Sequence, residues 1–407
     1  MTTQRRGHQH PHLPEVALPP QWVMAAAMLA VAVNLRVAMA SVPPLVQPIT
    51  GELHLSNAAV GVLTTLPVLC MGLFAPAAQW LSTRLGAVAS VLYAVVCAGL
   101  GSFARLWGSN VVVLYAGTFV LGVGIAVAGA LLPRLVKTLF PPERSGTMTG
   151  LYMFAMMGGA TASAALAVPL ADWLGSWQAS LASWSVLALV GAVAWAPFTL
   201  TAQRHRAATP PAAEHVRLPW RHRTALVLAA YLAVQSWLFY SSLAWISPTF
   251  VASGWARRDA GYLLSAFSLA QLTTGLLGPV LADRVSDRRR LLVPVALLAT
   301  VGLLGMWLAP TAAPWLWVVV VGLGQGAAFS VGLVLLVDYA ATPAASGRLT
   351  AMCFFVSYTL ASFGPFAMGA VRDVTGSFPA VWMVLVALMA VQIALAGVLR
   401  PGLARTH

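Results

Sequence analysis

The chain has 407 residues, of which 59% are hydrophobic and only 8% are charged, and its formal net charge is +13. Soluble domains carry about 25% charged residues, so this composition excludes an ordinary soluble protein and indicates an integral membrane protein. The positive charge alone would suit a nucleic-acid partner, but most basic residues lie in short segments between apolar runs. That distribution is typical of membrane topology, so we expect a lipid bilayer as partner and no nucleic acid.

The first 21 residues are polar and rich in proline, and His8, His10 and His12 alternate with other residues. Such spacing permits metal binding, but we favour a disordered cytoplasmic tail. All three cysteines lie within apolar runs, so they predict neither a disulfide framework nor a metal site. We therefore expect no metal and no cofactor.

Apolar segments long enough to cross a bilayer, which takes roughly 20 residues, recur along the whole chain. We expect twelve membrane-spanning helices, six on each side of the longest polar stretch in the middle of the chain. They lie at Trp22–Ser41, Ala58–Gln79, Ala87–Phe103, Val111–Val136, Ser145–Leu170, Trp177–Leu200, Ala225–Phe250, Ala260–Ala282, Leu291–Ala309, Pro314–Val337, Leu349–Ala370 and Phe378–Leu399.

The polar stretch divides the protein into two all-α membrane bundles joined by a linker. The expected parts are a tail at 1–21, a bundle at 22–200, a linker at 201–223, a second bundle at 224–399 and a tail at 400–407. Basic residues far outnumber other charges in the segments on the side of the two tails. By the positive-inside rule, both termini are cytoplasmic and the protein lies in the inner membrane of a bacterium.

Short glycine motifs recur in the two halves. Gly72-Leu-Phe-Ala-Pro76 in the second predicted helix matches Gly275-Leu-Leu-Gly-Pro279 in the eighth. Gly122-Val-Gly124 in the fourth matches Gly322-Leu-Gly324 in the tenth. Both pairs keep the same direction across the membrane, which is typical of a parallel repeat about an axis along the membrane normal. The sequence therefore predicts two pseudo-symmetric six-helix bundles.

Arg36 lies in the second half of the first predicted helix. Placing an arginine at membrane depth costs about 2.5–3.5 kcal/mol, so its side chain must face a cavity or a partner. A guanidinium is permanently charged and offers a planar fork of donors, which suits an anionic or electron-rich ligand. The alternative is that Arg36 reaches the headgroups or only joins two helices.

Other polar side chains near mid-depth complete a candidate solute site, because two-lobed transporters bind cargo at the midplane between their repeats. Arg36 and Tyr240 lie at similar depths in opposite halves, so the pseudo-twofold axis would set them across a cavity from each other. A guanidinium facing a phenol binds a small planar anion, with glutamines as neutral donors beneath it. For the glutamines and aromatic residues, helix packing remains the alternative. The predicted site comprises Asn34, Arg36, Tyr152, Gln235, Tyr240, Trp245, Gln271, Gln325 and Tyr358.

The turn from Pro279 to Arg289, with Asp283, Arg284, Asp287 and Arg288, resembles the signature between paired helices of the major facilitator superfamily. Its first-half counterpart keeps Arg84 but has Thr83 where the family usually has aspartate. The resemblance implies that these charges form ion pairs that hold the inner gate shut when the protein opens outward. Exposed pairs of this kind contribute under about 1 kcal/mol each, so they would bias a conformational equilibrium and not lock it.

A more specific resemblance is to the cyanate and 2-nitroimidazole transporter branch of that superfamily. It rests on motifs that span nearly the whole chain, which are Asn34-Leu-Arg36, Thr64-Thr-Leu-Pro67-Val-Leu-Cys70-Met-Gly72, Leu132-Pro133-Arg-Leu-Val-Lys137, Thr149-Gly150-Leu-Tyr152, Gln235-Ser236 with Tyr240 and Trp245, and Gly364-Pro365. The resemblance implies a monomeric secondary transporter that moves a small solute by rocker-switch alternating access. A small planar anion such as cyanate, or a nitroimidazole-like heterocycle, is the expected cargo.

The sequence contains no acidic residue in the middle of a predicted membrane helix that would couple transport to protons. Every acidic residue lies in a loop, a tail or a helix end, and the nearest to the membrane interior, Asp338, is also a potential partner of Arg348. We therefore expect that any proton travels on the solute or by another route. The alternative function is a proton-coupled exporter of drugs or metabolites. An enzyme is not expected, because every histidine lies in a tail or loop and no nucleophile at membrane depth has a base beside it.

Overall fold

The computed structural model describes residues 20–205, 218–400, 403 and 406, and nearly all of them are helical. The membrane-sized bundle is built from α1 (Gln21–Ala40), η1 (Pro43–Leu45), α2 (Val46–Leu53), α3 (Asn57–Leu73), α4 (Ala75–Leu85), α5 (Ala87–Ala104), η2 (Arg105–Trp107), α6 (Val111–Leu139), α7 (Pro142–Leu174), α8 (Trp177–Ser183), α9 (Ser185–His205), α10 (Arg223–Ala252), α11 (Arg257–Asp283), α12 (Arg289–Leu308), α13 (Pro314–Asp338), α14 (Pro343–Thr375) and α15 (Phe378–Val398). The tail at 1–19 and positions 206–217 of the linker lie outside the described residues.

Within the described part of the chain, eleven helical segments are long and apolar enough to cross a membrane. The pair α3 and α4 adds a twelfth span, which bends by 61° where α4 begins. Pro76 lies in the first turn of α4, and a proline ring has no N–H to continue the hydrogen bonds of the preceding helix. The expected set of twelve spanning helices is thus confirmed, with one span broken.

Several helices extend beyond the apolar segments that predicted them. The fifth span, expected at Ser145–Leu170, is α7, which runs from Pro142 to Leu174. The eleventh, expected at Leu349–Ala370, is α14, which runs from Pro343 to Thr375. Hydropathy reports only the lipid-facing length of a helix, whereas the backbone hydrogen bonds continue into polar turns outside the hydrocarbon region.

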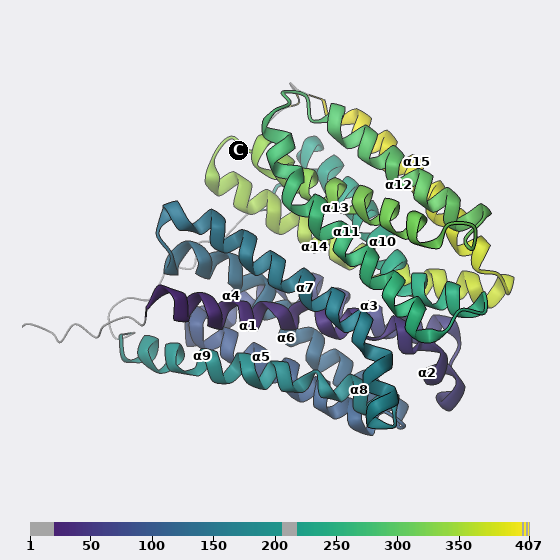
Figure 1. The fold of residues 1–407 in the computed structure, drawn as a ribbon. Coiled ribbons are helices and arrows are strands. Elements are labelled where there is room, and N and C mark those ends of the chain that lie inside the picture. Colours follow the sequence, from purple (N-terminus) through teal and green to yellow (C-terminus); the bar gives the residue numbers. More distant parts are fainter. Residues whose placement is uncertain (1–19, 206–217, 401–402, 404–405, 407) are drawn as a thin grey trace, which may run out of the picture.

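The helices form two bundles, α1–α9 and α10–α15, which meet along two long contacts (Figure 1). In one contact α3 packs on α14, and in the other α7 packs on α11. These helices are the second, eleventh, fifth and eighth spans. The second and eighth spans hold equivalent positions in the two bundles, and so do the fifth and eleventh. Exchanging the bundles therefore exchanges the two contacts, and the interface has the expected pseudo-twofold symmetry.

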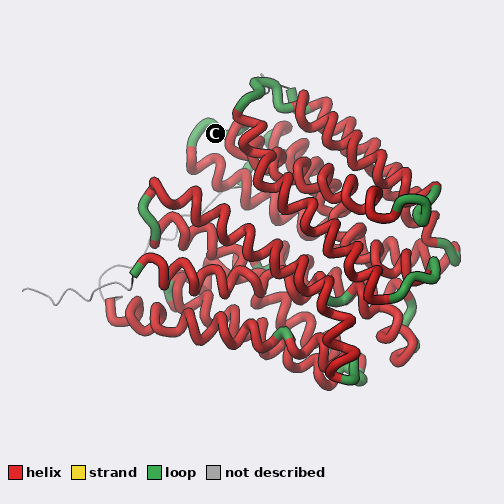
Figure 2. Tube along the Cα trace, viewed as in Figure 1, coloured by secondary structure: helices red, strands yellow, loops and turns green. Residues whose placement is uncertain are grey.

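The loops gather at two opposite ends of the molecule (Figure 2). We call the end at which α1 begins and α15 ends the terminal face, and the other end the opposite face (Figure 1). Exposed tryptophans lie near both ends, as expected for side chains at the two membrane–water interfaces. Those near the terminal face are Trp22, Trp80 and Trp220, and those near the opposite face are Trp107, Trp173 and Trp315.

Near the opposite face, the backbones of α3 and α14 are in direct contact. A Cβ atom added at Gly61 would lie 2.6 Å from the carbonyl oxygen of Pro365. One added at Gly369 would lie 2.5 Å from the carbonyl oxygen of Asn57. These separations are shorter than van der Waals contact, so both positions require glycine for the bundles to close here.

We expect Gly61→Ala to destabilise the structure described here, because overpacking a close contact typically costs about 1–3 kcal/mol. The melting temperature of the purified protein, followed by thiol-dye fluorescence, should fall. Gly129→Ala is the matched control, since no atom lies within 4 Å of a Cβ at that position. Equal melting temperatures for the two variants would contradict the proposed role of Gly61.

Candidate functional site

A cavity of about 100 Å³ lies between the two bundles. A single water needs about 10–15 Å³ and drug-sized sites measure about 300–1,000 Å³, so this cavity suits a small solute. Its walls come from α1 and α7 of the first bundle and from α10, α11, α13 and α14 of the second. The lining residues are Arg36, Met153, Met156, Met157, Gln235, Ser236, Phe239, Tyr240, Gln271, Leu272, Gly275, Leu276, Gln325, Gly326, Phe329, Ser330, Leu333 and Tyr358.

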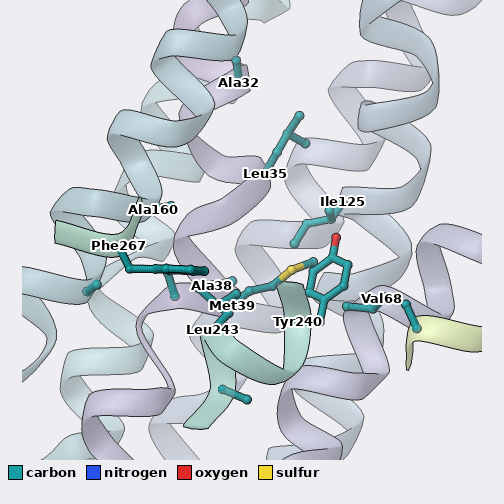
Figure 3. Close-up of a cluster of buried hydrophobic side chains, with 14 of the residues drawn as sticks. Ala32, Leu35, Ala38, Met39, Val68, Ile125, Ala160, Tyr240, Leu243 and Phe267 are labelled. Atoms are coloured by element: carbon teal, nitrogen blue, oxygen red, sulfur yellow. The ribbon is translucent and has the colours of Figure 1, made fainter. Parts of the chain in front are cut away.

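The cavity extends from mid-depth toward the terminal face, because it reaches Leu276 in α11 and Leu333 in α13. Side chains of both bundles form one apolar cluster that includes Met39, Tyr240 and Phe267 (Figure 3).

Polar contacts also join the bundles at the opposite face. The carboxylate of Asp373 in α14 accepts hydrogen bonds from the backbone N–H of Asn57 at 3.0 Å, from Nδ2 of Asn57 at 2.7 Å and from the backbone N–H of Ala58 at 2.8 Å. These donors lie at the start of α3, where the helix dipole favours a negative charge. Arg258 of α11 pairs with Asp172 of α7 at 3.3 Å. The structure is therefore closed at this face.

Arg36 contributes the positive charge of the cavity and is only 7% exposed. Its guanidinium carbon lies 5.0 Å from the ring centroid of Phe239 and 5.5 Å from that of Tyr240. Its Nη1 is buried and has no hydrogen-bond partner, and no described acidic side chain pairs with it. Cation–π contact contributes about 0.5–2 kcal/mol, but it supplies no hydrogen-bond acceptor for Nη1. The guanidinium thus retains capacity for an anionic or electron-rich ligand.

Glutamine side chains from three helices of the second bundle line the cavity. Nε2 of Gln235 in α10 donates to the backbone oxygen of Gln325 in α13 at 3.2 Å. The Oε1 atom of Gln235 and both amide atoms of Gln325 are buried without a partner. Gln271 of α11 also lines the cavity. Among the described contacts, the amide of Gln235 joins α10 to α13, while three amide atoms of Gln235 and Gln325 remain free for hydrogen bonds to a solute.

Tyr240 and Tyr358 line the cavity from α10 and α14. Their rings meet edge to face with centroids 6.4 Å apart. The Tyr240 hydroxyl donates weakly to the sulfur of Met71 in the first bundle, at 3.9 Å. The structure therefore brings Arg36 and Tyr240 together from opposite bundles, and their role in binding a solute stays a prediction.

Three predicted site residues do not line the cavity. Nδ2 of Asn34 donates to the backbone oxygens of Ala30 at 2.8 Å and of Leu187 at 3.1 Å, which joins α1 to α9. Two residues along a helix rotate a side chain by about 200°, so Asn34 and Arg36 face different ways. Trp245 donates to the oxygen of Pro365 at 3.0 Å and joins α10 to α14. Tyr152 is buried in α7 beside, but not among, the lining residues.

The predicted gate charges make contacts within their own bundle. Arg288 pairs with Asp338 at 2.8 Å, so Asp338 has this partner and not the expected Arg348. Asp287 pairs with Arg289 at 2.7 Å, and this hydrogen bond holds the pKa of the Asp287 carboxyl below its usual value.

The remaining gate residues lie at helix ends of the terminal face. Arg84 of α4 lies over the Trp80 ring one turn earlier, at 5.4 Å. Asp283 is the last residue of α11, and Arg284 follows it as the C-cap. Neither has an ion-pair partner among the described residues. The proposed gate across the bundles is thus not formed in this conformation.

Sequence analysis missed two features of the site. Met153, Met156 and Met157 line the cavity, and their spacing of three and four residues was a signal that they share one face of α7. The second, Arg105, lies outside the cavity lining; it is 1% exposed, and its Nη1 donates to the backbone oxygen of Ala38 at 3.4 Å. A cation at this place stabilises the C-terminal end of α1. No local pattern distinguishes it from an ordinary loop arginine.

Comparison with known proteins agrees with this architecture. The family model of the Major Facilitator Superfamily matches residues 24–365. The 2-nitroimidazole transporter of Escherichia coli is 32% identical, covering 88% of this chain and 90% of its own length. The cyanate transport protein CynX of the same organism is 30% identical, with coverage of 88% and 92%.

Among solved structures, a D-xylose–proton symporter has a similar fold. Its TM-score is 0.79 at 14% sequence identity, and the match covers 95% of this chain and 98% of the symporter. The helices, the symmetric interface and these relatives lead to one conclusion. The chain belongs to the major facilitator superfamily and is a multi-pass membrane transporter that resembles the cyanate and 2-nitroimidazole transporters of that family.

Proposed function

We propose that this transporter moves a small planar solute, either an anion such as cyanate or a nitroimidazole-like heterocycle, across the bacterial inner membrane. The observation that carries the proposal is the guanidinium of Arg36, which lines a cavity of about 100 Å³ and has a buried N–H without a partner. A hydrogen bond to a charged group contributes about 1.5–3 kcal/mol, so an electron-rich solute gains most of its binding energy here.

The shape of the cavity favours a flat solute. The rings of Phe239 and Tyr240 lie on one side of the guanidinium, and thioether side chains of α7 line the first bundle. Aromatic faces and flexible thioethers both pack well against a planar π-system. The named cargoes of the two E. coli relatives, 2-nitroimidazole and cyanate, are small planar solutes and support this choice.

The proposed mechanism is rocker-switch alternating access in a monomer, because one chain supplies both walls of the cavity. The excess of basic residues on the terminal face supports a cytoplasmic location for both termini. The conformation described above is then closed to the outside. To open outward, the bundles separate at the α3–α14 and α7–α11 contacts and approach at the terminal face. There we propose that Arg84, Asp283, Arg284, Asp287 and Arg288 form the inner gate.

The second candidate function is a proton-coupled exporter of drugs or metabolites. The many apolar side chains of the cavity favour it, since greasy cargo needs such a lining. Against it, none of the described residues that line the cavity is acidic, whereas proton coupling usually relies on a buried carboxylate. We therefore propose that any proton crosses on the solute itself.

We expect Arg36→Met to lower the affinity for cyanate and for 2-nitroimidazole by about tenfold to a hundredfold, because the charged donor is lost. Arg36→Lys should be intermediate, since it keeps the charge but not the planar fork. Ligand-induced thermal shifts give the affinities, and counterflow in proteoliposomes gives transport. Arg257→Met, outside the cavity, is the control. Wild-type affinity and transport in Arg36→Met would refute the proposed function.

We expect Asp338→Asn to leave the pH profile of transport unchanged in shape. Asp338 is paired with Arg288 at the end of α13, away from the cavity lining, and the proposed proton route does not use it. Counterflow and pH-driven uptake in proteoliposomes measure the profile. A profile that loses its pH dependence would instead identify Asp338 as the coupling residue.

A further inference from the structure

The second bundle presents a hydrogen-bond acceptor to the cavity that no other described residue satisfies. Gln235 lines the cavity and is 2% exposed, and its Oε1 has no partner. A buried acceptor without a partner carries the full cost of its lost hydration. A solute that enters the cavity displaces any water there, and it restores a hydrogen bond to this acceptor only if it brings a donor of its own.

The orientation of this amide group is set by its other end. Nε2 of Gln235 donates to the backbone oxygen of Gln325. This carbonyl oxygen can only accept, so it cannot pair with the amide oxygen of Gln235. A flipped amide would place two acceptors against each other. Oε1 of Gln235 is therefore a fixed acceptor.

The first bundle presents the opposite polarity. Arg36 has donors and no acceptor, and it lies over Phe239, which is one helical turn beyond Gln235 in α10. Four residues of helix correspond to a rise of about 6 Å. A solute that satisfies both groups must therefore carry an electron-rich group for Arg36 and a separate hydrogen-bond donor for Gln235.

We propose that Gln235 determines specificity by accepting a hydrogen bond from an N–H of the solute while Arg36 binds the electron-rich substituent at its other end. This inference rests on the proposed function and narrows it. The preferred cargo is a planar heterocyclic weak acid that carries a ring N–H, such as a nitroazole. A triatomic anion brings no donor and leaves Oε1 of Gln235 unsatisfied.

The same hydrogen bond would allow proton transport without a carboxylate of the protein. The N–H that donates to Gln235 is the acidic N–H of the solute, so the site selects the protonated solute over its conjugate base. Transport then follows the ionisation of each solute and not that of a protein side chain.

The test compares two ring solutes that differ only in the position of one methyl group, with the unmethylated ring as reference. The probes are 2-nitroimidazole, its N1-methyl derivative, which lacks the N–H, and its C4-methyl derivative, which has the same added volume and keeps the N–H. Affinities are measured by ligand-induced thermal shift for wild type, Gln235→Met and Gln392→Met. Gln392 is the matched control, because it is a buried glutamine of α15 that lies outside the cavity lining.

Wild type and Gln392→Met should bind the C4-methyl probe at least about tenfold more tightly than the N1-methyl probe, as expected for one lost hydrogen bond to a buried acceptor. In Gln235→Met this ratio should fall close to one. The ratio is internal to each variant, so partial loss of folded protein does not affect it.

Equal affinity of wild type for the two methylated probes, or an unchanged ratio in Gln235→Met, would overturn the role of Gln235. If Arg36→Met still weakens binding of both probes in that case, the proposed function survives. If wild type binds no ring probe and no cyanate, the proposed function fails, and this inference fails with it.

Discussion

The structure depends on one electrostatic constraint, which is a permanent positive charge at mid-depth that no carboxylate of the described residues pairs with. Arg36 has the faces of Phe239 and Tyr240 beside it and an open cavity before it. Aromatic quadrupoles lower the cost of burying the charge, but they do not replace hydrogen-bond acceptors. The protein therefore holds an unsatisfied hydrogen-bond donor between its two bundles, and this donor is the basis of the proposed binding of an electron-rich solute.

The interface between the two bundles is symmetric. The α3–α14 and α7–α11 contacts are equivalent under the pseudo-twofold operation, so the bundles meet through two matched pairs of helices. The opposite face uses close backbone approach at Gly61 and Gly369. At the terminal face, the pairs Arg288–Asp338 and Arg289–Asp287 lie within the second bundle, so they do not join the two bundles.

The sequence predicted how deep the candidate site residues lie in the membrane, but not which side of its helix each side chain occupies. Length and hydropathy placed Arg36 and Tyr240 at matching depths, and the structure brings them together. Asn34 and Trp245 lie at suitable depths too, yet they join helices, because hydropathy does not report rotation about a helix axis. The burial of Arg105 and the pairing of Asp338 with Arg288 arise from contacts between distant segments, which no local pattern encodes.

The contact of Asp373 with the start of α3 has a consequence for mutational tolerance. Two of its three donors are backbone N–H groups, which every residue except proline supplies. These two hydrogen bonds therefore tolerate most substitutions at Asn57 and Ala58, whereas replacement of Asp373 by a residue without an acceptor removes all three at once.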